Sequence, residues 1–168
     1  MLSGVVMKRS FVGGFSLVEL MVVIAIIGIM GSVAVVNLQR YTNNTNLRNM
    51  ARDIASDFQR CKARAISESR EYQVSFTTGT NGSYTISAPA TTLAAVSTTK
   101  LSTNYGGGLQ IVFEGTCNGY GGTSANVVTF QTRGTSKNGC VKLTNSIGST
   151  ATVTTNITGK AYVTFAMQ

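Results

Sequence analysis

The sequence predicts an α+β protein in which one long N-terminal helix packs on a C-terminal antiparallel β domain. Three observations carry this prediction. Residues 15–38 are almost entirely apolar, residues 39–70 repeat apolar side chains at helical spacing, and residues 71–168 alternate polar and apolar side chains between turns. We therefore expect a basic leader over 1–14, a membrane-spanning helix over 15–38, an amphipathic helix over 39–70 and a β-rich head over 71–168.

The apolar segment is long enough to cross a bilayer. At about 1.5 Å per residue, residues 15–38 span about 36 Å, against a hydrocarbon core of about 30 Å. Lys8 and Arg9 precede the segment and place its N-terminus on the cytoplasmic side. Gly28 and Ser32 form a small-residue face, which either permits close helix packing or is simply tolerated in lipid. The expected topology is a single membrane anchor with the head outside the cytoplasm.

Glu19 places a carboxylate inside this apolar segment. A charge at that depth costs roughly 2.5–3.5 kcal/mol on membrane-insertion scales, so it needs a partner and usually serves a function. Gly13 and Gly14 stand before the apolar core, whereas small residues follow the core of an ordinary secretory signal. Cleavage after Gly14 would therefore remove the leader and leave the helix attached to the product.

The amphipathic segment predicts a continuation of the same helix, because no proline interrupts residues 15–70. Thr42–Asn46 are poor helix formers in series, and we expect fraying or a bend there. Asp53 and Asp57 are interpreted as exposed helix charges beside basic neighbours. One helical stripe of apolar residues should face the head, and it consists of Leu47, Met50, Ile54, Phe58, Cys61 and Ala65.

The head shows a β pattern from Tyr72 onward. Residues 80–83 should form a hairpin turn, and residues 88–108 should form a long irregular connection. The expected strands are 72–76, 84–87, 109–114, 127–132, 140–144, 151–157 and 160–166.

Composition argues against an enzyme. The chain has no histidine, and Glu114 is the sole acidic residue beyond Glu71. A paired acid–base site, a metal site or a cofactor is therefore not expected. Three cysteines allow three pairings with one free thiol; we favour Cys117 with Cys140, which implies an oxidising compartment. Fourteen basic against six acidic residues favour anionic partners or a solvated basic surface.

The N-terminal pattern resembles the prepilin signature of type IV pilins and type II secretion pseudopilins. It comprises Lys8-Arg9, Gly14, Phe15 and Glu19, followed by the apolar helix. The resemblance implies cleavage between Gly14 and Phe15 by a prepilin peptidase and N-methylation of Phe15. It also implies that Glu19 pairs with the terminal amine of a neighbouring subunit. The implied partners are other pilins and an inner-membrane assembly platform, and the implied location is the bacterial inner membrane, with a periplasmic head, and then a filament.

The C-terminal part resembles the GspH/FimT group of minor pilins, which implies a head of two small sheets and a place at or near a filament tip. Val36 stands where major type IV pilins usually carry a proline, which also favours a minor subunit. The resemblance implies a type II secretion pseudopilus or a type IV pilus that supports protein secretion. The matching stretches are Arg60–Ile66, Tyr72–Phe76, Val128–Phe130, Arg133-Gly134, Cys140–Asn145 and Thr158–Val163.

An alternative function is DNA binding during natural transformation. Some FimT-type minor pilins bind DNA through a Gly-Arg-x-Arg motif. The corresponding stretch here, 159–162, retains the glycine as Gly159 and one of the two cations as Lys160. Arg133, Lys137, Lys142 and Lys160 would then contact phosphates without sequence specificity. The competing interpretation is a set of strand-edge cations that prevent aggregation.

Overall fold

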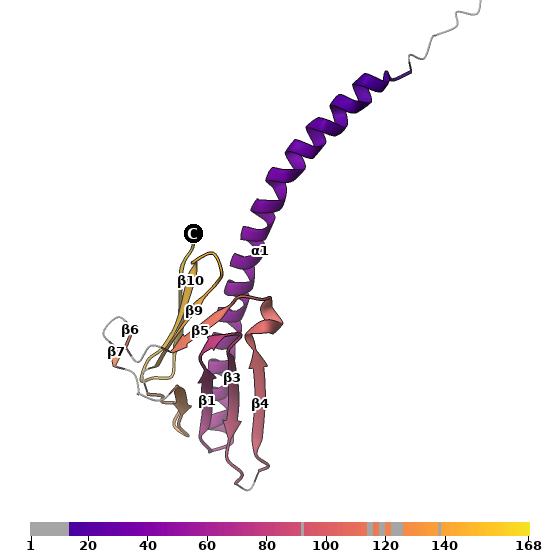
Figure 1. Ribbon diagram of the computed structural model, residues 1–168. Helices are drawn as coiled ribbons and strands as arrows, with labels where there is room; N and C mark the ends of the chain where they lie inside the picture. Colours follow the sequence, from indigo (N-terminus) through magenta and orange to yellow (C-terminus); the bar gives the residue numbers. More distant parts are fainter. Residues whose placement is uncertain (1–13, 92, 114–115, 118–119, 122–125, 138) are drawn as a thin grey trace, which may run out of the picture. The chain divides into compact units, whose positions relative to one another are not determined.

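The computed structural model describes residues 14–91, 93–113, 116–117, 120–121, 126–137 and 139–168 (Figure 1). One helix, α1 (Leu17–Ser67), precedes all the described strands, so the predicted α+β class is confirmed. The chain forms two compact units, 1–38 and 39–168, and α1 contributes to each. The strands are β1 (Tyr72–Thr77), β2 (Gly79–Thr80), β3 (Ser83–Ala88), β4 (Val96–Leu101), β5 (Gln110–Phe113), β6 (Thr116–Cys117), β7 (Tyr120–Gly121), β8 (Val127–Phe130), β9 (Gly139–Thr144), β10 (Thr150–Thr155) and β11 (Ala161–Ala166).

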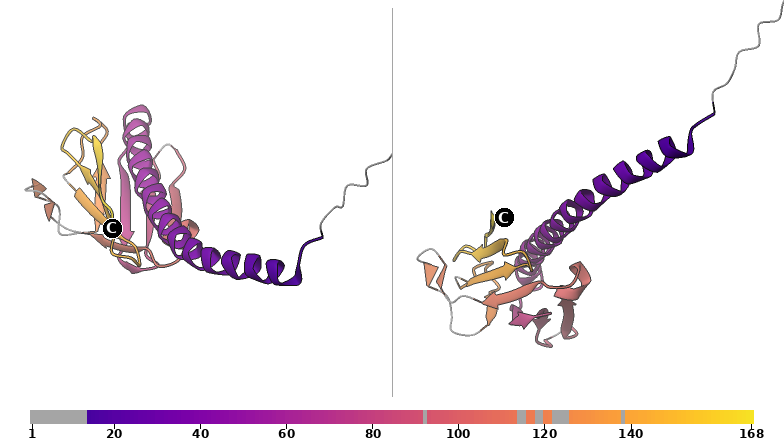
Figure 2. Two further views of the ribbon diagram at one scale, coloured as in Figure 1. Left: turned by 90° about the horizontal axis from the view of Figure 1, so that it is seen from above. Right: turned by 45° about the horizontal axis from the view of Figure 1, so that its top comes forward.

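Two antiparallel sheets make up most of the head, as expected (Figure 2). The first has the order β4-β3-β1-β8, and the second has the order β11-β10-β9-β5-β2. Strands β6 and β7 pair separately. Thr77 is the last residue of β1 and Gly79 begins β2, so the chain passes from one sheet to the other within a few residues.

The core lies between the second half of α1 and the two sheets. The predicted apolar stripe of the helix is fully buried, because a residue recurs on one helix face every three or four positions. Phe58 lies at its centre, with its ring centroid 6.1 Å from that of Phe76 on β1 and 5.6 Å from that of Phe130 on β8. In β1 the buried residues Tyr72, Val74 and Phe76 alternate with outward-facing polar ones, as a half-buried strand requires.

The helix continues through Thr42–Asn46, so the expected fraying is not observed. Asn44 accepts a hydrogen bond from Asn145 at 3.0 Å and donates one to the Gln168 carbonyl at 3.3 Å. Asn43 donates to Ser146 at 3.3 Å. These polar side chains are thus used by the head, and tertiary contacts outweigh a low helix propensity that costs a few tenths of a kcal/mol per residue.

Three turns of the head share one geometry. These turns are Gln131–Thr135, Asn145–Ser149 and Asn156–Lys160. In each, the backbone N–H of the first, polar residue donates to the carbonyl of the fifth residue. The fourth residue is a glycine with positive φ. Asn145 and Asn156 also accept backbone N–H groups through their side chains. Gly134 and Gly159 lie so close together that a Cβ on Gly159 would clash with the Gly134 carbonyl. Positive φ and this contact both require glycine there.

The expectation of an irregular connection over 88–108 is wrong. Strand β4 pairs with β3 along Val96–Leu101, and a 3-10 helix, η1 (Ser102–Tyr105), follows it. Four of the six side chains of β4 are polar and four are exposed, so the strand lacks the alternation that marks a half-buried strand. The other expected strands are present with shifted ends, and Glu114, the last residue of one of them, lies outside the described residues.

Candidate functional site

The start of α1 carries the residues of the predicted processing site. Gly14, Phe15 and Ser16 precede the helix, and Phe15 is 82% exposed. Ser16 stands at the N-cap position and Glu19 three residues later, which is the serine–glutamate spacing of a capping box. Glu19 therefore sits in the first turn, where the helix dipole favours a negative charge. Lys8, Arg9 and Gly13 lie outside the described residues.

The first part of α1 is long and apolar enough to cross a membrane by length and composition. The described side chains of residues 17–32 are all exposed. A Cβ on Gly28 would meet nothing within 4 Å, and the Ser32 hydroxyl donates to the Ile29 carbonyl at 2.7 Å. This face of the helix is open and its hydroxyl group is satisfied, so an apolar helix could approach it without leaving a polar group unpaired.

The structure describes the side chains of two cysteines. One is a free thiol and the other is disulfide-bonded. Cys61 is free and buried on α1, and Cys140 on β9 is disulfide-bonded. Burial, followed by the nearby Asp57 carboxylate, raises the pKa of Cys61 to about 12. The side chain of Cys117 lies outside the described part, and its pairing with Cys140 remains our proposal.

The interpretation of Asp57 as an exposed helix charge is wrong. Its side chain is only 3% exposed; it accepts a hydrogen bond from the Tyr84 hydroxyl at 2.8 Å and pairs with Lys100 at 2.7 Å. Burial and this hydrogen bond raise the pKa of Tyr84. Asp53 is half-exposed and accepts a hydrogen bond from Tyr105. The two carboxylates thus attach α1 to β3, β4 and η1 of the head.

A second charged cluster joins the end of α1 to the first sheet. Glu68 accepts hydrogen bonds from Arg64 at 2.8 Å, from Arg70 at 2.7 Å and from the Tyr72 hydroxyl at 2.6 Å. Arg70 is buried and also donates to the carbonyl of Ala94 at 2.7 Å. The Tyr72 and Arg64 hydrogen bonds contribute most to lowering the pKa of Glu68 to about 2. The cluster fixes the loop before β4 to the helix end.

The Glu68 cluster should make stability depend on pH. Its pKa in the folded state lies below the value of about 4.3 in an unfolded chain, so its stabilising effect is present above pH 4.3 and is lost as pH falls toward 2. We expect Glu68→Gln to lower the urea midpoint of the full chain in detergent at neutral pH, and the difference from wild type to vanish near pH 2. The exposed Glu71→Gln is the control, and a difference that persists at pH 2 would contradict the prediction.

The structure brings three of the predicted phosphate-contacting cations near one another. Arg133 and Lys160 are exposed and flank Gly134 and Gly159, whose turns are in contact, and the exposed Lys137 follows the first turn. Lys62 of α1, which the sequence did not indicate, donates to the Thr158 carbonyl at 2.7 Å beside them. Lys142 is separate: it lies within β9 between β5 and β10.

The described residues contain no group of three or more histidine, cysteine or acidic side chains that could hold a metal ion.

Comparisons with known proteins agree with this geometry. Residues 9–35 match the family described as the prokaryotic N-terminal methylation motif. This motif, at the start of a long helix that carries an antiparallel β head, supports a type IV pilin-like subunit. The fold is similar to that of the minor pseudopilin EpsH from the Type 2 Secretion System of Vibrio cholerae, with a TM-score of 0.56 and 12% identity over 71% of this chain and 97% of that chain. No curated protein sequence matches the chain.

Proposed function

We propose that the chain is a minor pilin or pseudopilin that is cleaved after Gly14, N-methylated on Phe15 and assembled at or near the tip of a filament. The filament is a type II secretion pseudopilus or a type IV pilus that supports protein secretion. The observation that carries the proposal is the methylation motif placed at the exposed start of α1. The similarity of the fold to EpsH, the minor pseudopilin of a secretion system, supports the choice of a minor subunit.

The chemistry of the start of α1 is consistent with this role. Cleavage would create an ammonium group on Phe15, four residues before Glu19, at a helix end whose dipole disfavours positive charge. In an apolar filament core, an unpaired ammonium and an unpaired carboxylate each cost several kcal/mol. Pairing the two groups between neighbouring subunits offsets this cost and favours one register. The other partners in this proposal are a prepilin peptidase, other pilins and the inner-membrane assembly platform.

Replacement of Gly14 tests the processing step. We expect Gly14→Glu to abolish leader removal, because a peptidase needs a small residue to approach the scissile backbone. Intact-mass measurement of the membrane-extracted chain should then show residues 1–14 retained and no added methyl group. Gly28→Ala is the matched control, since Gly28 lies within α1, beyond the cleavage site, with open space around it, and this variant should be processed normally. Normal processing of Gly14→Glu would contradict the proposal.

DNA binding by a minor pilin is the second candidate function. It is supported by the position of Arg133, Lys137 and Lys160, which are exposed in or next to two turns that contact each other at Gly134 and Gly159. If these cations contact phosphates, the affinity of the full chain for duplex DNA should fall steeply with salt, and the slope should lessen by about one for each cation removed. A gel-shift titration that shows no binding near 50 mM salt would leave the secretion subunit as the proposed function.

A further inference from the structure

Strand β4 is an outer strand with one edge open among the described strands. It pairs with β3 over six residues, Val96–Leu101, and the first sheet ends there. At an open edge, alternate residues point their N–H and C=O groups away from the sheet, where another strand can bond to them. Natural edge strands are usually protected by proline, by several charges or by being very short. Strand β4 has none of these features, because Lys100 is its sole charged residue.

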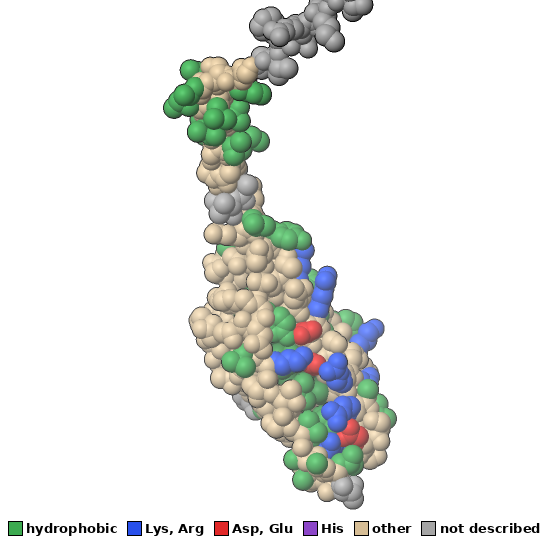
Figure 3. All heavy atoms as spheres, turned by 90° about the vertical axis from the view of Figure 1, so that its right-hand side faces the viewer, with side chains coloured by type: hydrophobic (Ala, Val, Ile, Leu, Met, Phe, Trp, Pro, Cys, Tyr) green, Lys and Arg blue, Asp and Glu red, His purple; other side chains and the backbone are tan. Residues whose placement is uncertain are grey.

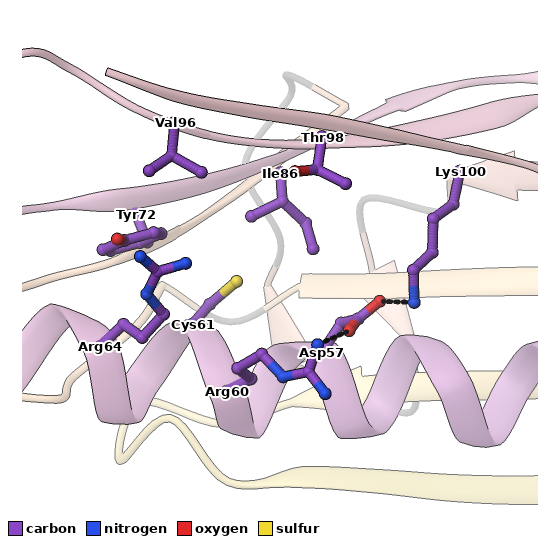
Figure 4. Close-up of a pocket in the computed structure, with 9 residues that line it drawn as sticks. All are labelled: Asp57, Arg60, Cys61, Arg64, Tyr72, Ile86, Val96, Thr98 and Lys100. Atoms are coloured by element: carbon purple, nitrogen blue, oxygen red, sulfur yellow. Dashed lines mark ion pairs between the residues drawn. The ribbon is translucent and has the colours of Figure 1, made fainter. Parts of the chain in front are cut away.

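Beside this edge, the space between the sheet and α1 is not completely filled. Val96, Thr98 and Lys100 of β4 line a cavity of about 80 Å³ together with Cys61 of the helix and Ile86 of β3 (Figure 4). In liquid water one molecule occupies about 30 Å³, so the cavity could hold a short side chain such as a carboxylate arm. Its lining combines apolar side chains with three cations and one carboxylate, that of Asp57, which is already paired with Lys100. The remaining positive charge suits an acidic side chain with an aliphatic stem.

Two arginines of α1 provide that charge. Arg60 and Arg64 line the cavity, and their side chains are 67% and 43% exposed. Arg60 lies 3.7 Å from Asp57, whose carboxylate is already bound by Lys100 and Tyr84. Arg64 uses its Nε for Glu68, so in the described part of the chain its two terminal nitrogens can still donate to another acceptor. Figure 3 shows charged side chains gathered on this side of the head.

The spacing of the arginines matches that of a strand. The helix runs along the strands in this region (Figure 4), and residues four apart on a helix are about 6 Å apart along its axis. Alternate residues of a strand repeat every 6.6 Å or so and point to the same face. An added strand could therefore present one acidic residue to Arg60 and a second to Arg64. These two residues would be separated by one residue in its sequence.

We propose that the β4 edge, with Arg60 and Arg64, binds an extended segment of a partner protein that carries two acidic residues separated by one residue. The segment adds a strand to the first sheet, and its acidic side chains enter the mouth of the cavity. The partner is a different protein, because no two acidic residues in this chain are separated by one residue. This docking surface goes beyond the proposed filament function and does not depend on it.

Fluorescence anisotropy of a labelled peptide tests the proposal. The probe is a short synthetic peptide that alternates glutamate with valine and threonine, titrated with the full chain in neutral detergent at low salt. We expect saturable binding that Arg60→Glu weakens by about tenfold or more, because like charges at an interface are strongly unfavourable. Arg52→Glu is the matched control, since Arg52 is an exposed arginine of the same helix outside the cavity, and it should bind like wild type.

Peptide variants separate strand addition from simple charge attraction. A peptide with adjacent glutamates, and one whose backbone is N-methylated at alternate residues, should each bind at least about tenfold more weakly. Three results would overturn the proposal. The N-methylated peptide could bind as tightly as the unmodified one, Arg52→Glu could weaken binding as much as Arg60→Glu does, or the alternating peptide could fail to bind. Displacement of the peptide by millimolar inorganic phosphate would also overturn the proposal, because it would indicate a simple anion site. Dimerisation of the chain that Arg60→Glu abolishes would overturn it too, because the occupant would then be a second copy of the chain.

Two further variants keep the test independent of folding and of the filament function. Arg60→Gln removes the charge of an exposed side chain, and circular dichroism identifies any loss of fold; binding by folded Arg60→Gln at the wild-type affinity would overturn the proposal. Glu19→Val should bind the peptide normally, because Glu19 belongs to the other compact unit of the chain. Failure of peptide binding and failure of filament assembly are therefore separate results.

Discussion

Replacement of Glu19 by valine should leave leader cleavage intact and almost abolish incorporation of the chain into filaments. In the proposed function, we expect cleavage to depend on Gly14 and Phe15, and assembly to depend on a pair between the Glu19 carboxylate and the terminal amine of a neighbouring subunit. Without Glu19 the ammonium of Phe15 would enter an apolar core unpaired, at a cost of several kcal/mol. A loss of about 3 kcal/mol already lowers an association constant by more than about a hundredfold.

The measurement is an immunoblot of sheared filaments and of membranes from cells that produce each variant. The matched variants are Glu19→Gln, which keeps the shape and removes the charge, and Glu19→Asp, which keeps the charge on a shorter arm. We expect Glu19→Gln to behave like Glu19→Val, and Glu19→Asp to retain part of the incorporation. Wild-type amounts of Glu19→Val in the filament fraction, with normal leader removal, would show that this carboxylate has no role in assembly.

Removal of the Asp57 carboxylate should destabilise the head by about 3 kcal/mol. Breaking a buried ion pair typically costs 3–5 kcal/mol or so, and the lower end applies because the Lys100 side chain is 29% exposed. Asp57→Ala also leaves the Tyr84 hydroxyl without its acceptor in the core. Asp57→Asn retains an acceptor for Tyr84, so it should cost roughly half as much.

Urea unfolding of the full chain in detergent, followed by circular dichroism, measures these free energies. The control is Asp53→Asn, which makes the same change of charge four residues earlier on the same helix. Because the Asp53 side chain is 50% exposed, we expect this variant to cost less than about 1 kcal/mol. An equal cost at the two positions would mean that burial of Asp57 does not determine its contribution.

The features that sequence could predict are those encoded by local spacing. The stripe from Leu47 to Ala65 repeats at three and four residues, and the structure buries every one of its members. The prepilin signature is equally local, because the leader charges, Gly14, Phe15 and Glu19 all lie within residues 8–19. Both could be identified without knowledge of any distant contact.

The features that sequence missed depend on distant contacts. Asp57 resembles a surface charge until Tyr84 and Lys100 are known to lie beside it. Strand β4 has no apolar alternation, because it lies at the end of its sheet and exposes most of its side chains. The helix persists through Asn43 and Asn44 because partners near the C-terminus use their side chains. The partners of Asp57 lie at least 27 positions away and those of Asn43 and Asn44 more than 100, so no local pattern could reveal them.

Burial of Cys61 has a consequence for how the head is oxidised. Disulfide exchange begins with attack by a thiolate, and the raised pKa of Cys61 keeps this sulfur protonated at neutral pH. Once α1 has packed on the sheets, the thiol can no longer attack the disulfide of Cys140. Before packing, all three cysteines can react. Packing of the helix therefore protects the disulfide of Cys140 from exchange with Cys61.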